Sequence, residues 1–161
     1  MTADYHPSSD FLIQVLNEEA PLTGSEYADA NLSKVIGFIA DEDAANRDWA
    51  AFILGNLDLD TPEIRSALIA FANDQSERVR AEAIRGLAQR DRTLALPYVR
   101  SALANPSATV NIFEAAAIVA DPTLVAPLKA FTGSSDDEWF DELVSEAIAA
   151  CEAARSNPQN L

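Results

Sequence analysis

The fold is decided by residues 74–89, which read DQSERVRAEAIRGLAQ. Apolar residues recur here at the spacing of one helical face, whereas charged residues occupy the opposite face. The apolar residues are Val79, Ala83, Ile84 and Leu87. Asp74 and Ser76 stand just before this pattern, and their side-chain oxygens suit the N-cap of a helix. The stretch therefore predicts one amphipathic helix.

A second amphipathic stretch follows at residues 93–104, which read TLALPYVRSALA. Its apolar stripe consists of Leu96, Val99 and Leu103. An isolated helix does not bury such a stripe, so a second helix must lie against it. The two consecutive stretches therefore predict a helical hairpin.

The hairpin pattern recurs along the chain. Residues 36–41 (IGFIAD) match residues 69–74 (IAFAND) at an offset of 33 positions. Further along, Asp91 recurs as Asp121 at an offset of 30 positions. Self-similarity at a period of this length predicts a stack of helical repeats.

These repeats resemble HEAT repeats, and especially the short HEAT-like repeats of phycobilisome lyases. The likeness rests on the helix opening D-x-x-x-x-VR-x-x-A-x-x-x-L that starts at Asp74 and on the DP-x-x-x-x-PL of residues 121–128. It covers about residues 30–132. The resemblance implies an all-α fold, a right-handed α-solenoid of about four and a half helical hairpins, in a single domain.

Two features depart from the family pattern. The period is shorter than the ~40–47 residues of ordinary HEAT units. The arginine of the motif is present at Arg47 and Arg80 but is replaced by Asn111 in the following repeat. Since this arginine commonly pairs with an aspartate of a neighbouring repeat in the family, the resemblance implies a structural role for Arg47 and Arg80.

We expect a flexible N-terminal arm over residues 1–7, the solenoid over residues 8–155 and a frayed tail over residues 156–161. The breaks in apolar periodicity predict pairs of helices closed by a polar terminal helix. The expected ranges are about 9–19 and 25–40, 46–57 and 62–73, 77–89 and 93–104, 109–120 and 123–132, and finally 136–154.

Charge is the most informative bulk property. The sequence has 11 basic and 26 acidic residues, a formal net charge of −15. Residues 1–64 carry −11, residues 65–100 carry +3 and residues 101–161 carry −7. Nucleic acid and anionic membrane surfaces would repel such a chain, so we expect neither as a partner.

Few residues offer chemistry. His6, the sole histidine, lies in the N-terminal arm without a partner at metal-ligand spacing, and Cys151 fits a buried small apolar residue better than a nucleophile. We therefore expect no catalytic residue, no cofactor and no metal. The N-terminal sequence lacks the apolar core of a signal peptide, and no apolar run reaches the ~18 residues of a membrane span, so we expect a cytoplasmic protein.

The remaining candidates lie on the surface. In HEAT-like stacks the second helices line the concave face, and the resemblance assigns Arg65, Tyr98, Arg100 and Lys129 to that face or its margin. Arginine and tyrosine are favoured in protein interfaces, but Arg65 and Arg100 also fit a simpler role in ion pairs with nearby acidic residues. The secondary candidates are aromatic residues that stand off the apolar stripes or in the terminal helix, namely Trp49, Trp139 and Phe140.

The sequence thus favours a non-enzymatic module that binds a protein or peptide through its concave and acidic surfaces. The acidic ends suit a basic partner. One alternative is an immunity or inhibitor protein that neutralises a basic toxin. Another is a subunit of a lyase-type enzyme similar to phycobilin lyases.

Leu87 tests the register of the repeats, because it and Leu103 are expected on facing stripes at the centre of the stack. Leu87→Ala should lower the free energy of unfolding by about 2–5 kcal/mol, as measured by urea unfolding. A loss below about 0.5 kcal/mol, typical of a surface substitution, would place Leu87 on a solvent-facing side of its helix.

Overall fold

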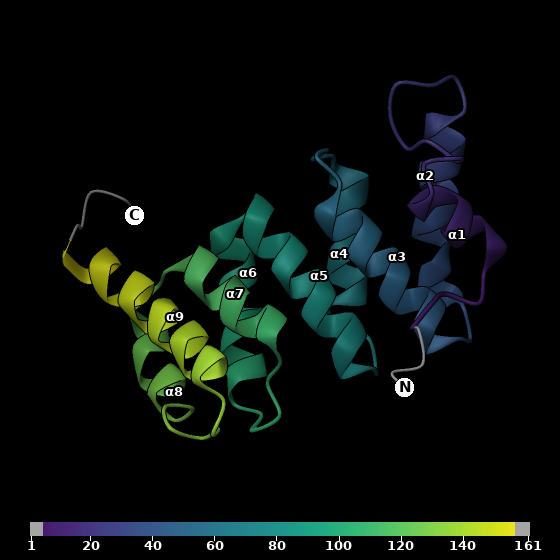
Figure 1. The fold of residues 1–161 in the computed structure, drawn as a ribbon. Coiled ribbons are helices and arrows are strands. Elements are labelled where there is room, and N and C mark those ends of the chain that lie inside the picture. The colour runs from purple at the N-terminus through teal and green to yellow at the C-terminus, as the bar shows by residue number, and fades with distance from the viewer. Residues whose placement is uncertain (1–4, 157–161) are drawn as a thin grey trace. The chain divides into compact units, whose positions relative to one another are not determined.

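The computed structural model describes residues 5–156, and all regular structure within this range is helical (Figure 1). The prediction of an all-α solenoid is confirmed. The helices are α1 (Asp10–Leu16), α2 (Ala28–Gly37), α3 (Ala44–Asn56), α4 (Pro62–Phe71), α5 (Glu77–Arg90), α6 (Arg92–Leu103), α7 (Val110–Val119), α8 (Val125–Lys129) and α9 (Glu138–Ser156), with 3-10 turns η1 (Phe38–Ala40) and η2 (Pro122–Leu124). Part of the expected arm, residues 1–4, and part of the expected tail, residues 157–161, lie outside the described range.

Side-chain oxygens fix where several helices begin. In four helices the N-cap side chain accepts a hydrogen bond from a backbone N–H of the first turn, which would otherwise have no partner. These residues are Ser9 before α1, Asp43 before α3, Thr61 before α4 and Asp91 before α6. The polar residues between the apolar stripes therefore set the helix boundaries.

Three elements are shorter than expected, the first being α1, which ends at Leu16 rather than near Glu19. The helix expected over residues 25–40 begins only at Ala28, and its last turn is the 3-10 turn η1. The helix expected over residues 123–132 consists of η2 followed by the five-residue α8. Pro127 alone does not account for this last difference, because its counterpart Pro97 lies inside the twelve-residue α6 without interrupting that helix.

The chain divides into two compact units, residues 1–86 and 87–161, and α5 runs across the division. In the first unit, α3 packs against α1, α2 and α4. Its apolar core includes Leu54, Ile64, Leu68 and Phe71, which are fully buried.

Two glycines allow α3 and α5 to approach closely within the first unit. A Cβ atom at Gly86 would lie 2.6 Å from the Cα of Gly55 and 3.3 Å from a methyl of Leu68. No real side chain tolerates the shorter distance, because the obstructing atom belongs to the backbone. Glycine at position 86 is therefore a packing requirement of the first unit.

In the second unit, α7 packs against α6 and α9, and α9 also packs against α8 (Figure 1). Phe113 of α7 is fully buried, and the rings of Phe131 and Phe140 meet it edge to face at 5.0 and 5.2 Å between centroids. Such edge-to-face pairs are a favoured aromatic geometry. Leu87 and Leu103 are also buried in this unit.

Arg47 and Asp74 connect successive repeats in the first unit. Arg47 Nε donates to Asp74 Oδ2 at 2.8 Å, and Arg47 Nη2 donates to Asp74 Oδ1 at 3.1 Å. The side chains are only 10% and 6% exposed. Burial alone would raise the pKa of Asp74, but hydrogen bonds from Arg47 and from the backbone N–H of Ser76 outweigh it and leave the pKa below its usual value. The pairing follows the family pattern.

The same arginine position also holds the loop before its own helix. Arg47 Nη1 donates to the carbonyls of Asp41 and Glu42, at 2.9 and 3.2 Å. Arg80 Nη1 donates to the carbonyls of Asp74 and Gln75, at 2.7 and 2.9 Å. In each case the acceptors stand six and five residues before the arginine. The repeated bonds give each loop the same attachment to the helix that follows it.

Removing one partner of the buried pair should be costly. Asp74→Ala leaves the Arg47 guanidinium buried without its carboxylate, so the free energy of unfolding should fall by about 3–5 kcal/mol. Arg80→Ala is a control, because Arg80 occupies the position of Arg47 one repeat later. Its side chain is more exposed, its hydrogen bonds go to neutral carbonyls and its ion pair with Glu77 is exposed, so the loss should be only about 1 kcal/mol. Equal losses for both variants in urea unfolding would contradict a special role for the buried pair.

Candidate protein-binding surfaces

The basic residues expected on the second helices belong to both units. In the first unit, Arg65 of α4 forms a two-point ion pair with Asp60, with N–O distances of 2.7 and 2.6 Å. Both side chains are partly exposed. Arg65 thus takes the local ion-pair role that the sequence left open, although its charge remains at the surface.

The other three expected residues lie in the second unit. Tyr98 is half-buried and Arg100 is exposed, both on α6. Arg100 Nη2 donates to Thr123 Oγ1 at 2.8 Å, and the Thr123 hydroxyl in turn donates to Asp121. Lys129, at the end of α8, is exposed. Arg100 therefore connects α6 to η2, while its side chain stays accessible.

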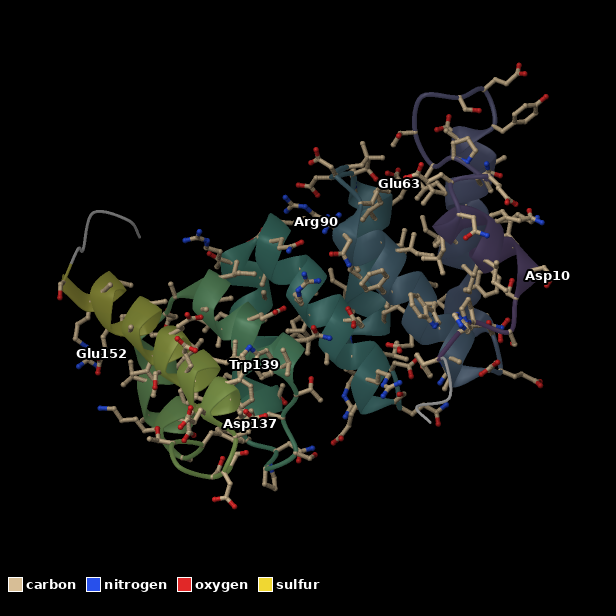
Figure 2. All side chains as sticks on the ribbon, in the orientation of Figure 1. Asp10, Glu63, Arg90, Asp137, Trp139 and Glu152 are labelled. Atoms are coloured by element: carbon tan, nitrogen blue, oxygen red, sulfur yellow. The ribbon has the colours of Figure 1, made fainter. Side chains whose placement is uncertain are left out.

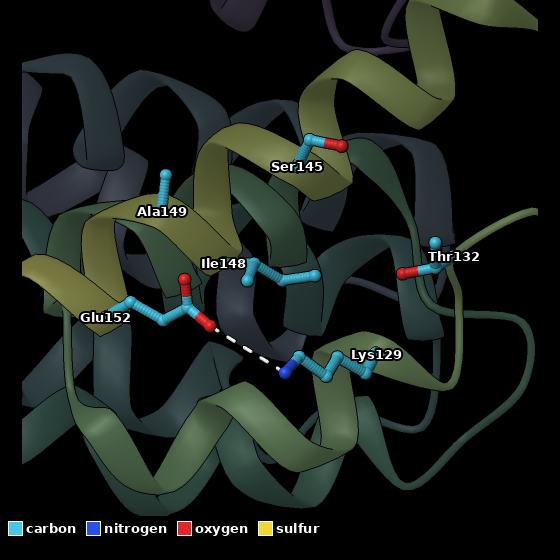
Figure 3. A pocket seen from close by; sticks show the side chains of 6 residues that line it. All are labelled: Lys129, Thr132, Ser145, Ile148, Ala149 and Glu152. Carbon is cyan, nitrogen blue, oxygen red and sulfur yellow. Dashed lines mark ion pairs between the residues drawn. The ribbon is translucent and has the colours of Figure 1, made fainter.

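A groove separates Lys129 from the terminal helix α9. Its volume is about 460 Å³. One wall comes from the end of α8 and the turn after it, and the other comes from α9 (Figure 3). The lining residues are Lys129, Thr132, Ser145, Ile148, Ala149 and Glu152. Lys129 Nζ lies 3.7 Å from Glu152 Oε1 across the groove.

The neighbouring aromatic residues of α9 have different environments. Trp139 is 57% exposed, whereas Phe140 is half-buried against Phe113. The sequence carries the reason, because Phe140 shares a helical stripe with the buried residues Val144 and Cys151. Trp139 stands about 100° away on the helix. Of the two secondary candidates in α9, Trp139 is therefore the one that presents a large aromatic surface.

Exposed acidic side chains are numerous in and just before α9. Figure 2 shows Trp139 and Asp137 at the start of α9 and Glu152 toward its other end. The exposed acidic residues in and just before the helix are Asp136, Asp137, Glu138, Glu142, Glu146 and Glu152. Negative side chains near a helix N-terminus are stabilised by the helix dipole, which explains why the first turn tolerates them. The result is an exposed indole within a negatively charged surface.

Trp49 lies in an aromatic cluster of the first unit. The ring of Tyr5 stacks on Trp49 at 6.1 Å between centroids, and Phe52 meets Trp49 edge to face at 5.4 Å. The guanidinium of Arg78 lies 4.3 Å from the centre of the Tyr5 ring. Tyr5, Phe52 and Arg78 are not among the residues expected at a site from the sequence. Trp49 and Phe52 are three residues apart and share one helical face, so the sequence could have indicated their contact. No neighbouring residue indicates that Tyr5 joins them.

Asp48 is buried beneath this cluster. It is only 6% exposed, and its Oδ2 lies 4.0 Å from Arg78 Nε. Burial raises the pKa of Asp48, and the Tyr5 hydroxyl and the Arg78 charge oppose this shift without cancelling it. Within residues 5–156, neither Asp48 Oδ1 nor Trp49 Nε1 has a hydrogen-bond partner. Asp48 is therefore a buried carboxylate with incomplete compensation.

Cys151 has the environment of a packing residue. It is fully buried, and its Sγ lies 3.6 Å from the carbonyl oxygen of Ala116. Burial raises the pKa of the thiol to about 11, so the thiolate that a nucleophile requires is scarce at neutral pH. His6 is exposed on the N-terminal segment. The described part of the chain contains no cluster of three acidic, histidine or cysteine residues that suits a metal ion, and none of its helices is long and apolar enough to cross a membrane.

Comparisons with known proteins agree with this architecture. A family model described as HEAT repeats matches residues 32–120. Protein YibA of Escherichia coli K12 and of E. coli O157:H7 is 29% identical over 138 residues, covering 86% of this chain and 45% of the relative. An X-ray structure of E. coli YibA has a TM-score of 0.63 at 25% identity and covers 88% of this chain and 54% of that chain. The chain spans about half the length of the curated relatives it matches.

Asp48 gives a pH-dependent prediction. Because its pKa is raised in the folded state, the folded protein retains this proton to a higher pH than the unfolded chain, and the free energy of unfolding falls as pH rises through this window. Asp48→Asn should therefore gain stability relative to wild type as pH rises from about 3 to 7 in urea unfolding.

Asp43 is a control of opposite sign. A hydrogen bond from Ser8 lowers the pKa of Asp43, so its contribution is present above the unfolded pKa and is lost as pH falls. Asp43→Asn should therefore lose stability relative to wild type as pH rises over the same range. The same pH trend in both variants would contradict the opposite environments of the two carboxylates.

Proposed function

The chain belongs to the HEAT-repeat family, and from this premise we propose that it is a non-enzymatic module that binds a basic protein. Helical-repeat proteins present extended surfaces rather than a single deep pocket. Fold alone does not assign a function, so the proposal depends on the surface residues of this chain.

The observation that supports it most is the exposed Trp139 in the acidic surface of α9. Tryptophan is the residue type most enriched among the energetically dominant contacts of protein interfaces. Its ring also attracts lysine and arginine side chains through a cation–π interaction. The nearby carboxylates of Glu138 and Glu142 add attraction for the same cations. A basic protein segment therefore matches both features.

The basic and aromatic residues of the second helices are further contact candidates. Arg100 is exposed beside the half-buried Tyr98, and this pair combines two favoured interface residue types. Lys129 borders the groove beside α9, while Arg65 presents a surface charge paired with Asp60 in the first unit. We assign these four residues to partner contacts that are secondary to Trp139. Trp49, largely covered by Tyr5, ranks after them.

A narrower function within this proposal is neutralisation of a basic protein, as an immunity protein does for a toxin. The net charge of −15 favours it, because a strongly acidic binder associates rapidly with a basic target and competes with the target's anionic substrates. The lyase-subunit alternative has less support, since Cys151 is buried and its thiol is held protonated.

Affinity purification of the chain from its own host, followed by mass spectrometry, supplies the partner for a kinetic test. Trp139→Ala should speed dissociation about 30-fold, the equivalent of about 2 kcal/mol, because it removes a desolvated anchor. Tyr27→Ala is the matched control, since Tyr27 is also a strongly exposed aromatic residue, at 64%, but lies in the first unit. Surface plasmon resonance measures both rates.

Salt dependence tests the charge of the partner. Raising the salt concentration from ~50 to ~300 mM should slow association steeply, since the screening length falls below 10 Å, while dissociation changes less. Salt-independent association would contradict a basic partner. Unchanged dissociation for Trp139→Ala would remove α9 from the interface.

A further inference from the structure

We propose that Asp48 and Trp49 form a binding site for an arginine side chain of the partner protein, and that Tyr5 and Arg78 of the chain itself close this site in the free protein. The inference rests on the proposed function, because it takes the partner to be basic. It adds a contact site whose residues all belong to the first unit.

Two buried polar atoms have unmet hydrogen-bonding capacity at this place. Asp48 is 6% exposed, and within residues 5–156 its Oδ1 accepts no hydrogen bond and Trp49 Nε1 donates none. Buried polar groups of this kind normally have a partner. Tyr5 stacks on Trp49 at 6.1 Å between ring centroids, and its hydroxyl also acts on the Asp48 carboxylate. Both side chains therefore border the position that Tyr5 occupies.

Arg78 shows which chemical group this place attracts. Its guanidinium lies 4.3 Å from the centre of the Tyr5 ring, and its Nε lies 4.0 Å from Asp48 Oδ2. The second distance exceeds that of a hydrogen bond. The Arg78 side chain is also 60% exposed, so the contact is weak. Arg78 is therefore an internal stand-in for a guanidinium that binds the carboxylate directly.

The site suits arginine better than lysine. The planar guanidinium can donate to both oxygens of one carboxylate and can stack on an aromatic ring, whereas the ammonium of lysine is a compact, strongly hydrated charge. The face of Trp49 provides a cation–π surface. Phe52, 37% exposed and edge to face with Trp49, extends this surface for the aliphatic part of the side chain. A main-chain carbonyl of the same partner segment is an acceptor for Trp49 Nε1.

Tyr5 can leave the site while the residues after it stay in place. Its side chain is 44% exposed, and its distance from Trp49 is toward the long end of the range for aromatic pairs. Pro7 is buried, and the backbone N–H of Ser9 donates to Asn46 Oδ1 at 3.0 Å. The segment is thus anchored from two residues after Tyr5. Rotation of Tyr5 and Arg78 away from Asp48 opens the site without unfolding a helix.

The amide of Nα-acetyl-arginine, added to the ¹⁵N-labelled full chain, is the probe. The citrulline derivative keeps its shape without the charge, and the lysine derivative keeps the charge without the planar fork. The sequence has two tryptophans, so Trp139→Phe assigns the remaining indole N–H signal to Trp49. Arginine amide should shift this signal saturably, with an affinity at least about tenfold above citrulline amide and about threefold above lysine amide.

Four variants test the roles of the residues. Tyr5→Ala and Arg78→Gln should each tighten arginine-amide binding about threefold, because each favours the open site, and damage to the fold would not produce this gain. Arg92→Gln, at an exposed arginine of α6 in the second unit, is the matched control and should change nothing. Asp48→Asn keeps the shape without the charge and should weaken binding at least about tenfold. Urea unfolding at pH 7 checks that this variant is folded.

Several outcomes would overturn the arginine site. These are equal affinity for the arginine and citrulline amides, a Trp49 signal that does not shift saturably, and weaker binding after Tyr5→Ala. If the natural partner depends on Trp139 and on salt but is insensitive to Asp48→Asn, this inference falls and the proposed function stands. If the natural partner depends on neither Trp139 nor salt, the proposed function itself falls.

Discussion

The buried ion pair between Arg47 and Asp74 is the interaction on which the first unit depends. Asp74 accepts two hydrogen bonds from the preceding repeat, while its carboxylate also accepts the backbone N–H of Ser76 and its carbonyl accepts a bond from Arg80. One residue thus fixes the loop, the helix that follows and the distance to the previous repeat. The close contact between Gly55 and Gly86 requires the same spacing, because the backbones of α3 and α5 leave no room for a side chain between them.

Much of the fold could be predicted because each hairpin repeats the same local rules. The apolar stripe around Leu87, the capping oxygens and the offset between successive aspartates identify the helices without any knowledge of their neighbours. The division of residues 122–129 into η2 and α8 was harder to foresee, because Pro97 occupies the position equivalent to Pro127 inside the unbroken α6. The repeat period and the capping residues therefore predict the repeats, but they do not predict the length of each helix.

The candidate surfaces were less predictable, because exposure is decided by contacts between distant residues. Trp49 stands off its apolar stripe, yet Tyr5 covers it from a segment more than forty positions earlier. The groove beside α9 brings Lys129 and Thr132 next to residues of α9 that are at least thirteen positions later in the sequence. Arg65 and Arg100 occupy equivalent motifs but have different partners, Asp60 and Thr123. The pairing of Arg65 with Asp60 is local and was among the expected roles, whereas the pairing of Arg100 with Thr123 joins two different elements and has no local signal.

The buried thiol of Cys151 can report on local unfolding of the second unit. It is the single cysteine of the sequence, it is fully buried, and its pKa of about 11 keeps it unreactive while the helices around it stay packed. An alkylating reagent therefore reacts at a rate set by transient separation of α9 from α7, in the manner of native-state hydrogen exchange. The first unit contributes no thiol to this signal. The alkylation rate of this one thiol therefore reports on opening of the second unit independently of the first.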